Sequence, residues 1–259
     1  MDYNKYPDGH WNTITDRKVA LDKYLSMYAD VYSQNNLDRI TLSVANISKD
    51  KKMRVLDFGG GIGILSIALA KRGHFVTLVE GSKASIETAK YYAKKSQVNI
   101  DTVHIEDDAT LLEEDFDIII MKDVIENINN DSGLLSKLSK YLRVGGTLLM
   151  STQNNYSANY IIEGIARKVI SPRKQWLGWD PTHVRWYNYK KLNHLLLNTG
   201  FEDFKYTSSY IVPYKLLLHF MPWVDSKKDS WLYRLDLKLQ KIKIFNKIGW
   251  NILVVCSKK

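Results

Sequence analysis

The stretch Val55-Leu56-Asp57-Phe58-Gly59-Gly60-Gly61-Ile62-Gly63 decides the fold of this 259-residue chain. An apolar strand is predicted to run into a carboxylate, then into a glycine loop, and then into a helix. Glycine permits a positive φ and lets a ligand press against the main chain. The helix that follows is expected to point its free N–H groups toward that ligand. The stretch therefore predicts a cradle for a nucleotide-type cofactor.

The spacing of the glycines distinguishes between two kinds of nucleotide cofactor. The dinucleotide fingerprint G-x-G-x-x-G needs a third glycine three positions after the second, and here that position holds Ile64. The carboxylate of Asp57 would repel a pyrophosphate, whereas it suits a ligand that carries an ammonium or sulfonium group. The pattern D-x-G-x-G-x-G, with Gly59, Gly61 and Gly63, therefore favours S-adenosylmethionine. A tight strand-to-helix turn that binds nothing is the alternative.

Acidic residues after the next two predicted strands support a cofactor with a ribose and an adenine. The apolar run 75–79 ends at Glu80, 21 positions after Gly59. This is close to the spacing expected for a carboxylate that accepts from ribose hydroxyls. The run 103–105 ends in acidic residues, of which Asp108 is favoured over Asp107 as the acceptor for the adenine amino group. An ordinary glutamate at a strand end is the alternative for Glu80.

Taken in order, these motifs resemble those of the class I S-adenosylmethionine-dependent methyltransferases. Residues 57–63 match the family's glycine motif, Glu80 its ribose carboxylate, and Asp108-Ala109 its adenine-side pair. Residues 116–120 match its fourth strand, and 141–146 match the turn before its fifth. The resemblance implies that S-adenosylmethionine binds here and leaves as S-adenosylhomocysteine. The cofactor-binding residues it implies are Asp57, Gly59, Gly60, Gly61, Gly63, Glu80, Gly81, Asp108, Ala109 and Lys122, the last through its main chain.

Within the class, the chain is similar to the ubiquinone-biosynthesis O-methyltransferases and their small-molecule relatives. Four stretches carry this similarity: 124–127, 151–154, 182–187 and 249–255. Those enzymes carry E-x-x-E-H after strand four, where a divalent metal has been proposed, but here the motif reads Asp123-Val124-Ile125-Glu126-Asn127. Because asparagine is a poor replacement for imidazole as a metal ligand, we expect no metal site.

The alternation of predicted strands and helices indicates an α/β fold with parallel strands and right-handed crossovers. Strands are expected near 53–58, 75–80, 101–105, 116–122, 146–151 and 203–208, and helices near 62–72, 83–96, 132–142 and 188–199. The resemblance adds a last, antiparallel strand near 252–256. The expected result is a Rossmann-like, doubly wound sheet of seven strands with helices on both faces.

We expect a single methyltransferase domain over 1–259. Helices near 17–32 and 35–48 would form an N-terminal cap within 1–50. The cofactor core is expected over 51–152 and a substrate lid over 153–187. The rest of the sheet is expected over 188–259, with a basic amphipathic insertion at 209–248.

The net charge of +9 is unevenly spread along the chain. Residues 1–150 hold 19 Lys/Arg and 21 Asp/Glu, whereas residues 151–259 hold 18 and 7. A basic second half attracts anionic partners, although lysine-rich solvated helices give the same composition.

The single cysteine, Cys256, excludes an internal disulfide and a cysteine-ligated iron–sulfur cluster. The polar start has no signal-peptide pattern, so the expected location is the cytoplasm.

Residues 153–187 form a long connection, and such connections are commonly functional. Ligands of open α/β sheets bind beyond the carboxyl ends of the strands, so this segment is predicted to cover the acceptor. Its candidate substrate-binding residues are Asn154, Tyr156, Tyr160 and Trp186. The aromatic residues would equally serve as a small local core.

Residues 209–248 combine an apolar stretch with a basic amphipathic helix. Such a segment can lie on an anionic membrane, or it can cap the sheet as most amphipathic helices of globular domains do. Peripheral contact with the inner membrane surface is therefore one hypothesis. The apolar face is formed by Leu232, Leu235, Leu239 and Ile242, and the basic residues around it are Arg234, Lys238, Lys241 and Lys243.

The expected chemistry is an in-line displacement at the sulfonium methyl group. The protein then supplies orientation and a dry site rather than a nucleophile, and a hydroxyl acceptor also needs a general base. His183 is the first candidate, because imidazole titrates near neutral pH. Asp123, at the end of strand four, is the second. A structural histidine at a helix entrance is the alternative for His183.

The predicted function is methyl transfer to a hydroxyl, or an amine, of a small-molecule acceptor. The basic, apolar second half favours an anionic or lipid-like acceptor. A nucleic-acid amino-methyltransferase is disfavoured, because the place of its Asp/Asn-Pro-Pro-aromatic motif reads Met121-Lys122-Asp123-Val124. No motif supports a protein methyltransferase, and a non-catalytic S-adenosylmethionine-binding protein would not need the intact acidic-glycine motif. The sequence leaves the oligomeric state open.

Overall fold

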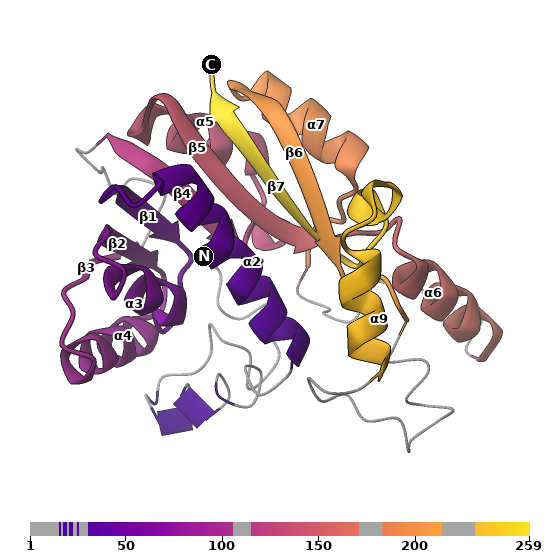
Figure 1. Cartoon of the computed structure of the whole chain (residues 1–259), viewed down its shortest axis with the longest axis horizontal. Coiled ribbons are helices and arrows are strands. Elements are labelled where there is room, and N and C mark those ends of the chain that lie inside the picture. The colour runs from indigo at the N-terminus through magenta and orange to yellow at the C-terminus, as the bar shows by residue number, and fades with distance from the viewer. Residues whose placement is uncertain are drawn as a thin grey trace.

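The computed structural model describes residues 16, 18–19, 21–22, 25, 31–105, 115–170, 183–213 and 231–259. These residues build one seven-stranded sheet in the order β3-β2-β1-β4-β5-β7-β6, with helices on both of its faces (Figure 1). β7 (Asn251–Lys258) runs antiparallel to both of its neighbours, β5 (Leu142–Gln153) and β6 (Phe201–Ser209). The other neighbouring strands are parallel. The predicted doubly wound α/β fold with an antiparallel last strand is confirmed.

The centre of the sheet is made of nearly continuous apolar runs, as parallel strands covered on both faces require. β1 (Arg54–Phe58) pairs with β2 (Phe75–Glu80) on one side and with β4 (Phe116–Lys122) on the other. β3 (Asp101–His104) forms the edge beyond β2. The carboxyl ends of these strands therefore meet at one edge of the sheet, where the glycine loop begins.

Successive residues of β4 point to opposite faces of the sheet and so enter two separate cores. Ile118 and Ile120 pack under α2 (Val31–Ser48) and α3 (Ile64–Ala70). Ile119 and Met121 pack under α5 (Asp131–Tyr141) and α7 (Tyr189–Asn198). α4 (Lys83–Lys95) lies against α3 and covers β2 and β3. Figure 1 shows α2 crossing the front of the sheet, with α5 behind it.

The remaining helices lie near β6 and β7. α6 (Ala158–Ile170) follows β5, and α9 (Trp231–Leu239) and the 3₁₀ turn η4 (Lys243–Lys247) precede β7. The buried carboxylate of Asp236 anchors α9, because its Oδ1 accepts from the backbone N–H groups of Ile211 at 2.7 Å and Val212 at 2.9 Å. η4 packs against β6.

The N-terminal part of the chain differs from the prediction. The sequence predicts a break between two helices near residue 34, but α2 runs without interruption from Val31 to Ser48. Asn35 and Asn36, at the expected start of the second helix, are both buried. Gln240 donates its side-chain N–H to Asn35 Oδ1 at 3.4 Å. This contact with the distant C-terminal part lies beside the expected break, and no local pattern in the sequence shows it.

Candidate active site

The floor of the glycine loop is the carboxylate of Asp57, of which 1% is exposed. Its Oδ2 accepts a hydrogen bond from Ser66 Oγ at 2.7 Å. Burial raises the pKa of Asp57 to about 6, although the hydrogen bond from Ser66 and the charge of Lys122 act in the opposite direction. A buried carboxylate in this position is best stabilised by a cationic ligand group, which fits the ammonium and sulfonium groups of S-adenosylmethionine.

The loop itself is packed tightly onto this floor. Gly59 N and Gly60 N both donate to Val79 O, at 2.8 and 3.3 Å, and so hold the loop over the end of β2. A Cβ atom at Gly60 would lie 2.6 Å from Asp57 Oδ2 and 2.8 Å from Leu78 Cδ1. Only glycine leaves room here for the main chain to approach the buried carboxylate.

Glu80, at the end of β2, holds the neighbouring backbone in place. Its Oε1 accepts from Gly81 N at 2.8 Å and Ser82 N at 3.0 Å, and its Oε2 accepts from Gly61 N at 2.9 Å. A carboxylate offers about four acceptor positions, so Oε2 keeps one that a ribose hydroxyl can use. These residues fit the expected cofactor. The predicted adenine contacts, Asp108 and Ala109, lie outside the described residues.

Replacing Gly63 with alanine is expected to lower the free energy of unfolding by about 2 to 3 kcal/mol, from backbone strain and overpacking. Gly63 has a φ of 77°, and a Cβ there would lie 2.9 Å from the Cβ of Ala89. Gly145→Ala is the matched control, because Gly145 has a φ of 70° with no atom within 4 Å of the added Cβ. The control should lose only about 1 kcal/mol. Urea unfolding measures the free energy of unfolding of both variants. Equal losses in the two variants would contradict crowding at Gly63.

Asp123 lies at the carboxyl end of β4 in the left-handed region, with a φ of 54°. Its Oδ2 accepts from Lys122 Nζ at 2.8 Å, while its Oδ1 accepts from Ser151 Oγ at 3.0 Å and Asn251 Nδ2 at 3.1 Å. Burial raises the pKa of Asp123, but the charge of Lys122 and these hydrogen bonds outweigh it and leave the pKa below its ordinary value. A carboxylate held in this way is a weak base.

The same contacts decide whether the position of Asp123 suits a divalent metal ion. Both oxygens of Asp123 are occupied, one by an ammonium group, and Asn127 stands where a histidine ligand would be needed. Among the residues that the structure describes, no three His, Cys, Asp or Glu side chains gather as metal ligands. The residues present here do not fit a divalent metal.

Glu126 is a further candidate site residue, and it is not among those that the sequence predicts. It lies on η3 (Ile125–Asn127), with 1% of its surface exposed. Thr152 Oγ1 donates to its Oε2 at 2.9 Å, whereas its Oε1 is buried without a hydrogen-bond partner. Burial, and then the negative charge of Asp123, raise the pKa of Glu126 to about 8. Its position three residues after Asp123, within the stretch 124–127 that carries the family similarity, is the signal that the sequence offers.

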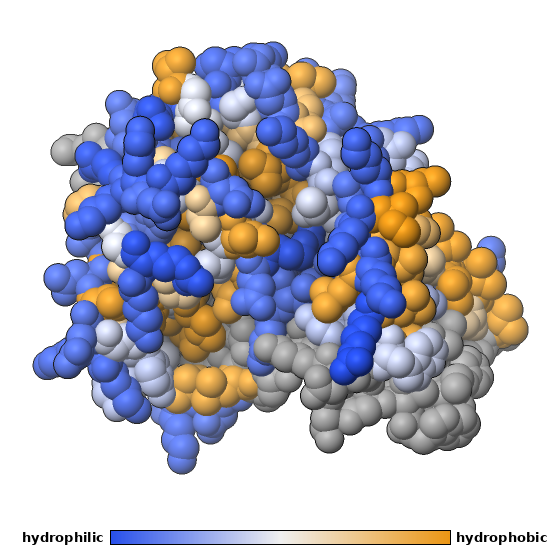
Figure 2. Space-filling view, viewed as in Figure 1, coloured by the Kyte–Doolittle hydropathy of each residue, from blue (hydrophilic) through white to orange (hydrophobic). Residues whose placement is uncertain are grey.

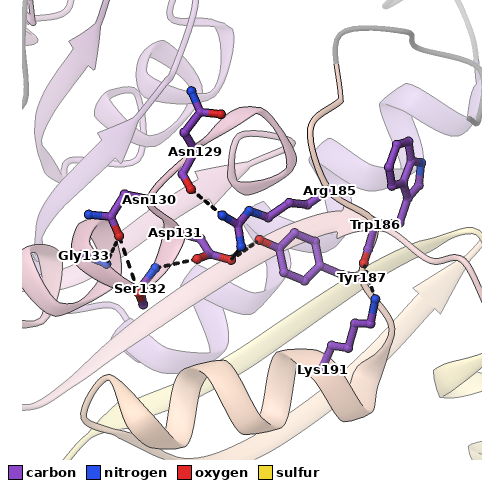
Figure 3. Close-up of polar contacts among 9 residues, drawn as sticks. All are labelled: Asn129, Asn130, Asp131, Ser132, Gly133, Arg185, Trp186, Tyr187 and Lys191. Atoms are coloured by element: carbon purple, nitrogen blue, oxygen red, sulfur yellow. Dashed lines mark hydrogen bonds and ion pairs between the residues drawn. The ribbon is translucent and has the colours of Figure 1, made fainter.

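The segment 183–187 is bound to the β4–α5 connection (Figure 3). Asp131 Oδ2 accepts from Tyr187 Oη at 2.8 Å and from Arg185 Nη1 at 3.1 Å, and Arg185 Nη2 donates to Asn129 O. Val184 N donates to Glu126 O at 3.0 Å. These contacts bring the buried His183 beside Glu126. Two predicted candidates from distant parts of the sequence, His183 and Asp123, are therefore both near η3.

The predicted substrate-binding residues occupy different environments. Asn154 is buried, and its Nδ2 donates to Lys247 O and Gly249 O, both at 2.9 Å, while its Oδ1 accepts from Tyr156 N at 3.0 Å. Tyr156 is 47% exposed, and Tyr160 is half-buried. In Figure 3, Trp186 points away from Asp131, and its Nε1 is buried without a hydrogen-bond acceptor. The substrate roles of these residues stay predictions.

The strand order with an antiparallel β7, the acidic-glycine loop after β1 and the glutamate after β2 together define a class I S-adenosylmethionine-dependent methyltransferase. The methyl donor of such an enzyme is S-adenosylmethionine. The chain belongs to the methyltransferase domain family, whose model matches residues 32–206.

Comparison with known proteins agrees with this class. A ubiquinone biosynthesis O-methyltransferase of Rickettsia canadensis (strain McKiel) is 29% identical over 172 residues, which cover 64% of this chain and 68% of the relative. A protein of the same name from Rickettsia typhi (strain ATCC VR-144 / Wilmington) is 30% identical over 59% of this chain and 58% of its own length. Among solved structures, the magnesium protoporphyrin IX methyltransferase of Synechocystis PCC 6803 with bound SAH superposes with a TM-score of 0.60. It is 15% identical over 88% of this chain and 84% of its own, which shows a shared fold.

Proposed function

We propose that the protein transfers a methyl group from S-adenosylmethionine to a hydroxyl group of a small-molecule acceptor. The observation that carries the proposal is the buried carboxyl of Glu126, one oxygen of which has no hydrogen-bond partner. A buried carboxyl oxygen left in this way needs an explanation, and a catalytic role is one that fits its place beside the cofactor loop. The name of the Rickettsia relatives, which act as O-methyltransferases in ubiquinone biosynthesis, supports a hydroxyl acceptor.

The cofactor loop and Glu126 are close enough to share one reaction site. A Cβ at Gly59 would lie 2.5 Å from Val124 Cγ2, so the side chain before η3 packs directly on the loop. Glu126 follows two residues later in the same turn. An acceptor beside Glu126 would therefore lie next to the methyl donor, as an in-line displacement requires.

A hydroxyl acceptor must lose its proton as it attacks, whereas a neutral amine attacks through its free electron pair. Asp123 is a poor proton acceptor, since three donors already hold its carboxylate. The ionised carboxylate of Glu126 is a stronger base than that of Asp123, because the pKa of Glu126 is raised to about 8. His183 is the second group at this position, and it would contact the acceptor from the lid segment.

The test is a methylation assay of the full chain with a catechol and the matching aromatic amine as alternative acceptors. Formation of S-adenosylhomocysteine and of each methylated product is measured by mass spectrometry. O-methylation of the catechol is expected, and methylation of the amine alone would contradict the proposal. Calorimetry with S-adenosylmethionine distinguishes a non-catalytic relative, which would bind the cofactor poorly or not at all.

His183→Ala is expected to lower the turnover number by about 10-fold, since His183 would orient the acceptor rather than take its proton. The affinity for S-adenosylmethionine should be unchanged, because His183 lies beside Glu126 and not on the glycine loop. Steady-state kinetics and calorimetry measure the two quantities. An unchanged turnover number would remove His183 from the mechanism, and weaker cofactor binding would make its role structural.

A further inference from the structure

The outward face of α9 and η4 is unusual because apolar and basic side chains alternate along it. The face that packs on the protein carries Leu232, Tyr233 and Asp236, all of them buried. On the opposite side, Trp231 is 60% exposed, Ile242 48% and Ile244 74%. We define this outward face, here called the α9–η4 surface, by Trp231, Leu235, Lys238, Lys241, Ile242, Lys243 and Ile244, all of which are exposed.

The α9–η4 surface carries positive charge without an exposed acidic residue. Between residues 231 and 250 the single acidic residue is Asp236, and its carboxylate is buried against the backbone N–H groups of residues 210–212. Ordinary protein surfaces intersperse both signs of charge. In Figure 2, hydrophilic and hydrophobic side chains lie side by side over the region of α9.

α6 adds a second exposed apolar stripe. Ile161, Ile165 and Val169 lie at i, i+4 and i+8, and they are 48%, 61% and 76% exposed. Asn159 Nδ2 donates to Tyr210 O, so the first turn of α6 is fixed to the same segment that anchors α9. Figures 1 and 2 show α6 on the same side of the molecule as α9, with hydrophobic side chains over it.

We propose that the α9–η4 surface binds the surface of an anionic lipid bilayer. Lysines at the rim of an inserted apolar face pair with anionic headgroups, while exposed isoleucine and tryptophan side chains enter the headgroup–acyl boundary. A nucleic acid would match the lysines, but it would leave the apolar side chains without a partner. The proposed contact is peripheral, since the amphipathic α9–η4 surface would lie in the plane of the headgroups. Among the helices that the structure describes, none is long and apolar enough to cross a membrane. This proposed membrane binding does not depend on the identity of the methyl acceptor.

The test is co-sedimentation of the full chain with vesicles of phosphatidylcholine alone or mixed with phosphatidylglycerol. Binding is expected with the anionic vesicles and should weaken as salt is raised. Lys241→Gln/Lys243→Gln should reduce partitioning by about 30-fold, since each lysine near an anionic surface contributes on the order of 5-fold. Ile242→Ser/Ile244→Ser should reduce it by about 10-fold, through lost apolar burial.

The matched control is Lys90→Gln/Lys94→Gln on α4, which removes the same charge at the β3 edge, opposite the β6 edge that η4 covers. It should bind vesicles as the unaltered protein does, and all variants should keep their affinity for S-adenosylmethionine. Recovery of the unaltered protein in the supernatant would overturn the proposal, as would equal losses in the control. A third result would also overturn the proposal: only the lysine variant loses vesicle binding, and the unaltered protein binds an RNA duplex as tightly as the vesicles. That result would identify a general polyanion-binding surface.

Discussion

Glu126→Gln is expected to lower the turnover number about 10²- to 10⁴-fold, the contribution typical of a general base. The change keeps the size of the side chain, and Thr152 Oγ1 can still donate to the remaining carbonyl oxygen. Only the ability to take up a proton is removed. Affinity for S-adenosylmethionine should therefore be unchanged by calorimetry.

The pH dependence of the reaction provides a second measurement on the same residue. Turnover of the unaltered enzyme should rise with pH through about 8, the raised pKa of Glu126, because the base must be ionised. Asp123, Lys122 and Tyr187 interact electrostatically with Glu126, and His183 lies beside it. The glutamine variant should lose this rise. If the turnover number of Glu126→Gln stays within about 3-fold of that of the unaltered enzyme, the loss is well below any general-base effect. Glu126 would then not take the proton.

Asp57→Asn is expected to have opposite effects on stability and on cofactor binding. The pKa of Asp57 is about 6 in the folded protein, above its ordinary value of 3.8. The folded state therefore favours the protonated form, and stability is lost as the pH rises from about 4 through 6. A neutral asparagine avoids this loss. At pH 7 the variant without cofactor should be more stable by on the order of 1 to 3 kcal/mol.

Binding should change in the other direction, because the cationic groups of S-adenosylmethionine lose a buried carboxylate. We expect the Kd to rise about 10- to 100-fold, the effect of losing a charged hydrogen-bond partner. Thermal unfolding with and without the cofactor measures both effects in one experiment. S-adenosylhomocysteine is the control ligand, since it keeps the ammonium group but lacks the sulfonium charge. An unaltered Kd for both ligands would show that Asp57 only shapes the loop.

The sheet and the cofactor loop could be predicted from the sequence because both depend on local patterns. The apolar runs before Asp57 and Glu80 each become a buried strand, and the glycines lie where the chain must turn. The fifth strand is expected to start at 146, but β5 starts at 142, because its pairing with Phe116 crosses a register shift that no periodicity reveals.

The candidate site around Asp123 and Glu126 could not be predicted to the same extent. Its hydrogen bonds join residues far apart in the sequence, such as Asn251 with Asp123 and Tyr187 with Asp131. The sequence identified Asp123 and His183 as isolated candidates. The sequence did not show that contacts with Lys122 and Ser151 make the Asp123 carboxylate a weaker base. Nor did it show that Glu126 is buried with one oxygen that has no hydrogen-bond partner.

The position of β7 in the sheet has a consequence for the synthesis of the protein. β7 lies between β5 and β6, although it follows both along the chain, and its first residue supplies the amide that bonds to Asp123. While the ribosome is still translating residues before 251, β5 has an open edge and β6 has no strand to pair with. Open edges of this kind invite pairing with other chains. The nascent protein is therefore most vulnerable to aggregation just before its last strand emerges, and chaperone demand should be greatest at that stage.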